Sequence, residues 1–338
     1  MIETVDFLSK EYIVYIRCLT YNHADYIKEC LEGLAQQKTN FRYACVVIDD
    51  CSPDGEQNRI KEWLNNECES SSIQRYDLEL VELYVAQHSK NPNCLFAFYL
   101  LKQNLSGDRR KEELVAEWRR NCKYEAICEG DDYWTDDNKL QEQVDFLEKH
   151  SNYSATSSNA LVLRAKSDPM KEFGSPVSRD YYDLREIIEH RRFHTATVVF
   201  RTASMTNCPY YKKGRWDTFM WCCLLTQAPI HYEGKVTCVY RKQHQGVTEL
   251  TPRVKWLSLT STWADILTEC FVPKYVKRND VVRSVTRDII RIYFMHHRQL
   301  NIEDKKKLRS LYRHNFSVWN VGSDLKEILI QSVKLFKK

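Results

Sequence analysis

Residues 12–23, YIVYIRCLTYNH, give the strongest indication of the fold of this chain. Residues 12–19 form a nearly continuous apolar run, which is typical of a parallel strand that is covered on both faces. Polar residues follow at once, and Asn22 can cap a helix whose apolar face includes Ile27 and Leu31. We therefore expect a strand that leads directly into a helix, which is the repeating unit of a parallel α/β sheet.

This strand–helix order repeats along the first half of the chain. We expect further strands at 43–48, 78–85 and 124–128, and helices from the turn at 51–55 to about residue 66, at 108–122 and at 137–150. Residues 151–192 are less regular, and an expected helix at 216–226 separates two more strands, at 195–201 and 236–241. The pattern predicts a doubly wound, mostly parallel sheet with helices on both faces.

The last part of the chain differs from the rest in charge and in pattern. Residues 251–338 contain 18 Lys and Arg against 8 Asp and Glu, a net charge of +10, whereas the whole chain carries +4. The first 250 residues are therefore acidic, with a net charge of −6. Beyond Pro252 we expect helices and no strands, so we place a domain boundary near residue 250.

The composition excludes several classes of protein. The chain has 338 residues, of which 43% are hydrophobic, and this excludes wholesale disorder. Its 9 glycines form neither GxGxxG nor GxxxxGK[ST], which argues against NAD-linked and P-loop chemistry. No apolar run is long enough to span a membrane, and residues 1–10 lack the pattern of a secretory signal, so we expect a cytoplasmic protein.

The chain contains 13 cysteines, an odd number that cannot all pair. None of them has the CxxC or Cys/His spacing of zinc ligands. Cys18 and Cys45 lie within strand-like runs, where an apolar side chain is expected. We therefore expect buried, reduced thiols rather than a framework of disulfides.

Polar clusters follow three of the expected strands, at residues 20–22, 49–50 and 129–132. In an open parallel sheet, ligands bind beyond the carboxyl ends of the strands, so these residues are candidates for one site. The three carboxylates of the last cluster would repel one another unless a cation or a proton intervenes, and oxygen ligands suit Mg²⁺ or Mn²⁺. The alternative is a solvated acidic turn that caps the next helix.

Three segments resemble family 2 glycosyltransferases of the GT-A fold, in the order and at the separations typical of bacterial members. They are residues 19–23 (LTYNH), 47–55 (VIDDCSPDG) and 128–134 (CEGDDYW), and residues 138–147 and 194–201 resemble the family as well. The resemblance covers about residues 12–250. It implies a GT-A catalytic domain at 1–250, with a nucleotide-binding half at about 12–135 and an acceptor half at about 136–250, followed by a basic helical region at 251–338.

The resemblance also implies roles for the polar residues at the strand ends. The nucleotide-binding residues would be Thr20, Tyr21, Asn22, Asp50 and Asp131. The metal ligands would be Asp132, Asp131 and Glu129, with Asp132 the most direct ligand of Mn²⁺ or Mg²⁺ on the diphosphate. The chemistry agrees, because a divalent cation stabilises the negative charge that develops on a nucleoside diphosphate as it leaves.

The segment that should carry the catalytic base departs from the family pattern. Gly214 and Arg215 stand where members have a Glu-Asp pair, and Asp217 matches a later aspartate. The reaction needs a carboxylate to take the proton of the acceptor hydroxyl, so Asp217 is the candidate base. Otherwise Asp217 only begins a helix. Arg215 needs another role, such as binding an anionic acceptor.

Three further residues have both a functional and a structural interpretation. His244 is expected at the diphosphate, although it stands one residue later than in the family, and the alternative is a surface loop histidine. His194 begins a segment that the family uses near the acceptor, and the alternative is a buried structural histidine. Trp134 can stack on a sugar ring or belong to the core.

We expect a metal-dependent, inverting glycosyltransferase that moves a sugar from a UDP-linked donor to a hydroxyl of a glycan or of a lipid-linked glycan. The alternatives are a non-catalytic homologue that binds a nucleotide-sugar or a glycan, and a nucleotidyltransferase, although the Gly-rich basic loop of that class is absent. The basic C-terminal region either contacts the inner face of the cell membrane or packs on the catalytic domain. No nucleic-acid motif is present, so we expect no nucleic-acid partner.

Overall fold

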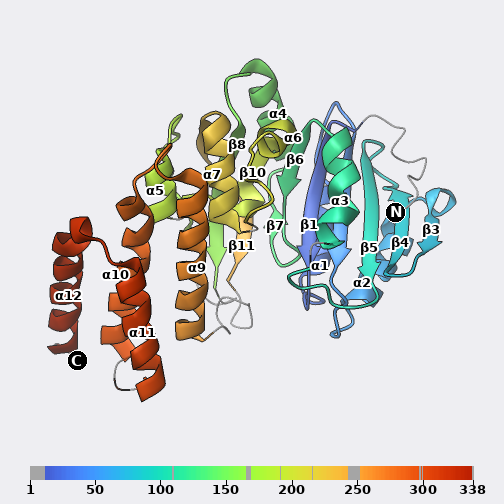
Figure 1. Cartoon of the computed structure of the whole chain (residues 1–338). Coiled ribbons are helices and arrows are strands. Elements are labelled where there is room, and N and C mark those ends of the chain that lie inside the picture. Colours follow the sequence, from blue (N-terminus) through green and yellow to red (C-terminus); the bar gives the residue numbers. More distant parts are fainter. Residues whose placement is uncertain are drawn as a thin grey trace. The chain divides into compact units, whose positions relative to one another are not determined.

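Figure 1 shows the computed structural model of the chain, which describes residues 12–108, 110–164, 169–190, 192–214, 216–242, 252–296, 298 and 300–336. The chain divides into two compact units. The first comprises Met1–Tyr181, Phe193–Cys208 and Gln227–Lys242, and the second comprises Tyr182–Arg192, Pro209–Thr226 and Gln243–Lys338. The second unit therefore includes two segments from before residue 250, and the domain boundary expected near that residue stays a prediction.

The first unit is built on one large sheet. Its strands are β1 (Val14–Thr20), β2 (Tyr43–Asp49), β3 (Gln74–Asp77), β4 (Val81–Gln87), β5 (Cys94–Leu101), β6 (Tyr124–Ile127), β7 (Tyr133–Trp134), β8 (Ala155–Leu163), β9 (Lys171–Glu172), β10 (Val198–Arg201) and β11 (Ile230–Arg241). Their order is β3-β4-β5-β2-β1-β6-β10-β8-β11-β7, with β9 beside β8. The neighbours β5, β2, β1 and β6 are parallel, whereas β4 and β10 run antiparallel to the strands beside them. The expected α/β fold is confirmed, with a sheet that is parallel around β1 and mixed toward both ends.

Helices pack on both faces of this sheet, as the apolar strand patterns predict. The helices of the first unit are α1 (Ile27–Ala35), α2 (Glu56–Glu67), α3 (Arg110–Asn121), α4 (Lys139–Lys149) and α6 (Thr202–Thr206). Successive residues of β1 point to opposite faces. Ile16 belongs to the same buried cluster as Leu31 of α1 and Ile60 of α2, whereas Tyr15 clusters with Trp118 of α3.

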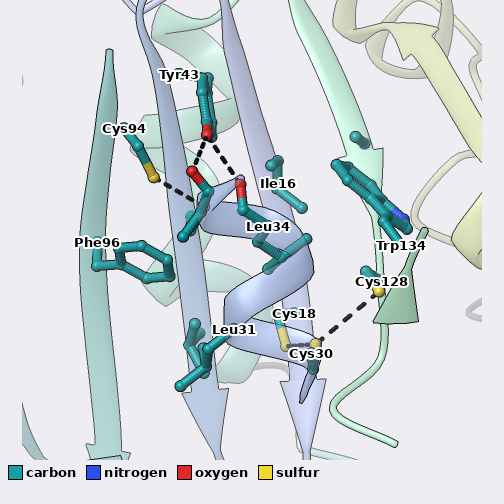
Figure 2. Packing of buried hydrophobic residues seen from close by; sticks show 14 of the residues in the cluster. Ile16, Cys18, Cys30, Leu31, Leu34, Tyr43, Cys94, Phe96, Cys128 and Trp134 are labelled. Atoms are coloured by element: carbon teal, nitrogen blue, oxygen red, sulfur yellow. Dashed lines mark hydrogen bonds between the residues drawn. The ribbon is translucent and has the colours of Figure 1, made fainter. Parts of the chain in front are cut away.

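The core under α1 is rich in thiols (Figure 2). Cys30 Sγ of α1 lies 3.8 Å from Cys18 Sγ of β1 and 3.9 Å from Cys128 Sγ, which follows β6. The Tyr43 hydroxyl donates a hydrogen bond to the Leu34 carbonyl oxygen at 2.8 Å and so ties β2 to the same helix. All 13 cysteines are free and all but one are buried, so they pack as small apolar side chains, as expected.

The second unit is helical. Its helices are α5 (Leu184–Glu189), α7 (Asp217–Gln227), α9 (Arg253–Phe271), α10 (Arg278–His296), α11 (Ile302–Asn315) and α12 (Val321–Phe336). Its core contains aromatic pairs, and Phe271 packs against Tyr210 and Phe219 with ring centroids 5.6 Å apart in each pair. The described residues beyond Pro252 form helices and no strand, as predicted. No helix within the described ranges combines the length and the apolar character that crossing a bilayer requires.

The structure differs from the sequence-based expectation at several elements. The strands β3, β5, β7, β8 and β9 are additional, and β5 lies between β4 and β2. The strand expected at 78–85 begins at Val81 and is antiparallel to β5. The helix expected after Asn22 begins at Ile27 and does not use Asn22 as its cap; Asn22 instead has a φ of 61° in the connecting turn.

Candidate active site

The carboxyl ends of β1, β2 and β6 meet at one edge of the sheet. Because β1 lies between β2 and β6, the chain leaves β1 toward one side and later returns on the other. The Asp50 N–H donates to the Thr20 carbonyl oxygen and the Gly130 N–H donates to that of Leu19, each at 3.0 Å. Ligands in open α/β sheets bind where the strand order reverses in this way. The three predicted polar clusters therefore lie at one edge.

Gly130 brings the acidic loop that follows β6 into contact with β1. A Cβ atom at Gly130 would lie 2.5 Å from the Thr20 Cβ, which is closer than real Cβ atoms approach. Glycine is therefore required at this position, where the backbone passes directly over a neighbouring side chain. The contact places Thr20 beside the loop that carries Glu129, Asp131 and Asp132.

Glu56 is a buried residue of this site that the sequence analysis did not single out. It is the first residue of α2, and its carboxylate accepts hydrogen bonds from the Thr20 hydroxyl, from the His23 N–H at 2.9 Å and from the Ser52 hydroxyl at 2.8 Å. Burial raises the pKa of Glu56 to about 7. An acidic residue in the first turn is common in helices, so its sequence position gives no sign that it fastens the loop after β1.

The other predicted nucleotide-binding residues have different surroundings. Tyr21 and Asn22 are exposed, next to the buried Thr20. The carboxylate of Asp50 is buried, and it accepts hydrogen bonds from the Leu105 N–H and from Lys111 Nζ, each at 2.6 Å. The carboxylate of Asp50, at the end of β2, is therefore already paired with the ammonium group of Lys111.

Asp132 is the most deeply buried carboxylate of the acidic loop. Its Oδ1 accepts a hydrogen bond from the Arg241 N–H at 2.9 Å, and its Oδ2 lies 3.7 Å from His194 Nδ1. Burial raises the pKa of Asp132 well above its ordinary value, and the charges of Asp131 and Glu129 raise it further. A cation bound to this carboxylate would stabilise its charged form and so lower the pKa of Asp132.

The two neighbouring carboxylates contact other parts of the first unit. Glu129 Oε2 accepts a hydrogen bond from the Thr195 hydroxyl at 2.9 Å. Asp131 Oδ2 lies 3.8 Å from His23 Nε2. Burial lowers the pKa of His23, so its imidazole is predominantly neutral at pH 7.

Arg241, at the end of β11, is a second site residue that the sequence analysis missed. Its guanidinium forms an ion pair with Glu29 of α1 and donates a hydrogen bond to the Asp131 carbonyl oxygen at 2.8 Å. The same guanidinium lies 4.3 Å from the centroid of the Tyr133 ring. Arg241 therefore holds the acidic loop between α1 and β11.

His194 and Trp134 are both buried. The His194 ring packs against Tyr240 with centroids 4.1 Å apart, and its Nδ1 accepts a hydrogen bond from the Ala196 N–H at 3.3 Å. The Trp134 indole N–H donates to the Ala196 carbonyl oxygen at 2.8 Å, and Lys139 Nζ lies 4.2 Å from its ring centroid. Figure 2 shows Trp134 within the cluster of buried apolar residues. This position agrees with the second interpretation from the sequence, in which Trp134 belongs to the core.

The three remaining candidates lie in the second unit or outside the described residues. Asp217 begins α7, in the second unit. Arg215 and His244 lie outside the described residues. Within the described ranges, no three or more His, Cys, Asp or Glu side chains form a group that could hold a metal ion by themselves.

Comparison with known proteins finds a family model and several proteins that this chain resembles. The sequence profile described as "Glycosyl transferase family 2" matches residues 18–77, which include the ends of β1 and β2 and the Glu56 helix. The resemblance to family 2 glycosyltransferases is confirmed. Among curated proteins, the uncharacterized proteins Rv1520 of Mycobacterium tuberculosis (strain H37Rv) and Mb1547 of Mycobacterium bovis are each 27% identical over 183 residues. The match covers 54% of this chain and 45% of each relative, so the chain spans about half the length of these proteins.

Solved structures of S. aureus TarS share the fold. S. aureus TarS in complex with UDP-GlcNAc has a TM-score of 0.60 and 14% identity over 88% of this chain and 79% of the TarS chain. TarS in complex with UDP has a TM-score of 0.58 and 15% identity over 89% of this chain and 79% of that one. The expected GT-A fold is therefore confirmed.

Proposed function

We propose that this chain is an inverting glycosyltransferase that transfers a sugar from a UDP-linked donor to a hydroxyl of a glycan or of a lipid-linked glycan. The observation that carries the proposal is the acidic loop with the buried Asp132, packed through Gly130 against Thr20 at the edge where the strand order reverses. The choice of UDP is supported by TarS, which shares the fold and was crystallised with UDP and with UDP-GlcNAc.

In this proposal the residues at the ends of β1 and β2 bind the nucleoside. Tyr21 is exposed and offers a ring to the base, and Thr20 and Asn22 flank it. Asp50 is paired with Lys111, but each carboxylate oxygen has two lone pairs, so Asp50 can still accept a hydrogen bond from the base. Asp131 lies on the same loop as Asp132 and faces the ribose or the metal.

The acidic loop fits a divalent cation that is shared with the substrate. Mg²⁺ and Mn²⁺ are commonly held by one or two carboxylates, with waters and phosphate oxygens completing the shell, so a group of three protein ligands is not required. Asp132 is buried beside two other acids, and we assign it as the main ligand, with Asp131 and Glu129 in support. The ion would supply charge neutralisation to the departing UDP.

The acceptor hydroxyl attacks the anomeric carbon, the bond from that carbon to the diphosphate breaks, and the hydroxyl proton goes to a carboxylate. We assign this proton transfer to Asp217, with Arg215, His194 and His244 as weaker candidates for acceptor and diphosphate contacts. The reaction takes place in the cytoplasm, and at the inner face of the cell membrane when the acceptor is lipid-linked.

One observation favours a binding protein without turnover as the second candidate. A Cβ atom at Gly214 would lie 2.5 Å from Phe219 Cγ and 2.6 Å from Trp216 Cζ3. A glutamate, which family members carry here, does not fit this packing, so the first position of the family's Glu-Asp pair is closed in this chain. Tight binding of UDP-sugars with no transfer to any glycan would favour this candidate.

A thermal-shift screen of nucleoside diphosphates with and without Mn²⁺ tests the proposal. UDP with Mn²⁺ should raise the Tm, because a ligand at about a hundred times its Kd adds about 2.7 kcal/mol to the free energy of unfolding. Other nucleoside diphosphates should shift the Tm much less. Equal shifts for all bases, or no shift with any of them, would contradict the proposal.

A pair of variants tests the role of the acidic loop. Asp132→Asn should lower UDP release from UDP-sugars by about 10²–10³-fold, because it removes the carboxylate that neutralises the leaving group. The matched control is Asp137→Asn, whose carboxylate pairs with Lys38 Nζ at 3.0 Å on the surface and should have no effect on turnover. Release of pyrophosphate instead of UDP would identify a nucleotidyltransferase.

A further inference from the structure

The terminal helix α12 is oriented with its polar side inward. Asp324 and Gln331 are each 3% exposed, and Glu327 is also buried. Leu325 and Leu329, on the opposite side, are 55% and 66% exposed. A helix on the surface of a unit in water normally has the reverse arrangement, because burial of apolar area drives its packing.

Specific contacts within the second unit fix this orientation. Glu327 Oε1 accepts hydrogen bonds from Arg291 Nε of α10 at 2.7 Å and from Gln331 Nε2 at 2.8 Å. Asp324 accepts hydrogen bonds from the Tyr312 hydroxyl of α11 at 2.8 Å and from the Thr286 hydroxyl at 3.3 Å. Rotation of α12 to bury its leucines would break these bonds and leave charged groups without partners, so the apolar side remains outward.

The exposed apolar side of α12 continues into the turn before it. We call the following set the apolar stripe: Val318, Trp319, Val321, Leu325, Leu329 and Ile330. Trp319 is 85% exposed. Eight of the thirteen exposed large apolar side chains of the described residues lie between residues 302 and 330. Such a concentration marks an interaction surface rather than ordinary scattered exposure.

Most of the exposed charged side chains of α11 and α12 are positive. Both carboxylates of α12 are buried, and Lys326 is the exposed charged residue among the α12 side chains that the structure describes. On α11, the cations Lys306, Lys307, Arg309 and Arg313 are exposed, and so is the carboxylate of Glu303. Arg309 and Arg313 also line a hollow of about 270 Å³ between α10, α11 and α12 whose remaining walls are apolar and aromatic. Two cations of α11 therefore share this hollow with the apolar Ile328 of α12.

We propose that the apolar stripe docks the protein on an anionic phospholipid surface, with the leucines and Trp319 at the level of the headgroups. A tryptophan and leucines flanked by lysines and arginines are the composition of helices that lie in the membrane interface. Each cation near an anionic leaflet adds to the attraction, and no exposed carboxylate of the described α12 residues opposes it. A second copy of the chain is a poorer match, because it would bring two surfaces of the same positive charge together. The inference does not depend on sugar transfer.

Vesicle flotation of the full chain, without nucleotide, tests this inference. The protein should bind vesicles of equimolar phosphatidylglycerol and phosphatidylcholine at least about tenfold more strongly than vesicles of phosphatidylcholine alone, and salt at about 1 M should reduce the difference. The double variant Leu325→Gln/Leu329→Gln keeps the net charge and should weaken binding at least about tenfold, because it removes apolar area that the interface would bury. Trp319→Gln should weaken binding independently.

The matched control is Met170→Gln/Val177→Gln, which changes two apolar side chains of similar exposure, 45% and 69%, in the first unit. This control should bind like the parent, and circular dichroism should be the same for all variants because the changed side chains are exposed. Failure to bind anionic vesicles, or binding that the leucine variant leaves unchanged, would overturn the inference. Self-association that the leucine variant abolishes, without vesicle binding, would overturn it in favour of a second copy.

Discussion

Glu125 and Asp132 lie near the two ends of β6 and are both buried, but the charges around them have opposite signs. Glu125, within the strand, receives hydrogen bonds from Arg17 Nε at 2.9 Å and from Arg119 Nε at 2.8 Å. Burial acts to raise its pKa, but the attraction of Arg119 and Arg17 outweighs burial and lowers the pKa of Glu125 to about 2. Asp132, beyond the strand end, has acidic neighbours, and its pKa is raised well above the ordinary value by burial and by those neighbours.

The difference separates a structural carboxylate from a candidate functional one. The chain itself neutralises Glu125, so this residue gains nothing from a ligand. The chain surrounds Asp132 with two further acids, so an incoming cation would lower its free energy. Burial alone does not distinguish the two residues, whereas the charges in contact with them do.

The largest expected effect is at Glu125. Glu125→Gln should lower the free energy of unfolding by about 3–5 kcal/mol, because it leaves two partly buried guanidiniums without their counter-charge. Urea denaturation at pH 7 measures this change. The control is Glu148→Gln, whose exposed carboxylate pairs with Lys123 at 2.6 Å and should contribute less than about 1 kcal/mol. Equal losses in both variants would remove the distinction between buried and surface pairs.

The contribution of Glu56 to the free energy of unfolding should depend on pH. Its pKa is raised from 4.5 to about 7 by burial, so the folded chain holds this proton more tightly than the unfolded chain. The resulting stabilisation is fully present below pH 4.5 and is lost as the pH rises through 7, a change on the order of 3 kcal/mol. Glu56→Gln should remove this slope from the unfolding free energy measured in urea between pH 4.5 and pH 8. A slope that persists in the variant would show that other groups cause it.

Gly130 lies between Glu125 and Asp132 in the sequence, and its contact with Thr20 positions the loop that carries Asp132. Gly130→Ala should lower the free energy of unfolding by about 1–3 kcal/mol, because its Cβ would overlap Thr20. Gly322→Ala is the control, since nothing lies within 4 Å of its Cβ and alanine in a helix should raise stability by about 0.5–1 kcal/mol. Differential scanning calorimetry of both variants should therefore show shifts of Tm in opposite directions.

The smallest expected change in the free energy of unfolding is at Asp132. Substitution there should stabilise the protein, whereas substitution of Glu125 should destabilise it. Asp132→Asn should raise the free energy of unfolding at pH 7 by about 1 kcal/mol without ligand, because it removes a poorly compensated buried charge. The asparagine oxygen can still accept the hydrogen bond from the Arg241 N–H. Urea denaturation beside Asp137→Asn gives the comparison. A loss of stability as large as that of Glu125→Gln would make Asp132 a structural residue.

The parts of the fold that the sequence predicted are those with a local pattern. The strands β1, β2 and β6 are apolar runs that end at polar clusters, so both their position and their role could be predicted. The strand β8 could not, because Ser157, Ser158 and Asn159 are polar and yet buried. The hydroxyls of Thr197 and Thr237 satisfy the two serines, each at 2.6 Å, and these partners are distant in the sequence.

The same limit applies to the candidate site. The carboxylates after β6 were predicted because three of them fall within residues 129–132 and match a family pattern. Glu56 and Arg241 were not, because their roles come from contacts with residues that are 33 or more positions away in the sequence. The orientation of α12 was left open for a similar reason, because the polar contacts that hold its apolar side outward come from α10 and α11.

The position of Arg241 also has a consequence for how the protein is made. Its contacts join the end of β11 to Asp132 and to Glu29, which are separated from it by 109 and 212 residues. Contacts over such distances form late, because a long loop of chain must first close. On the ribosome, the acidic loop is complete about a hundred residues before its fastening arginine is synthesised.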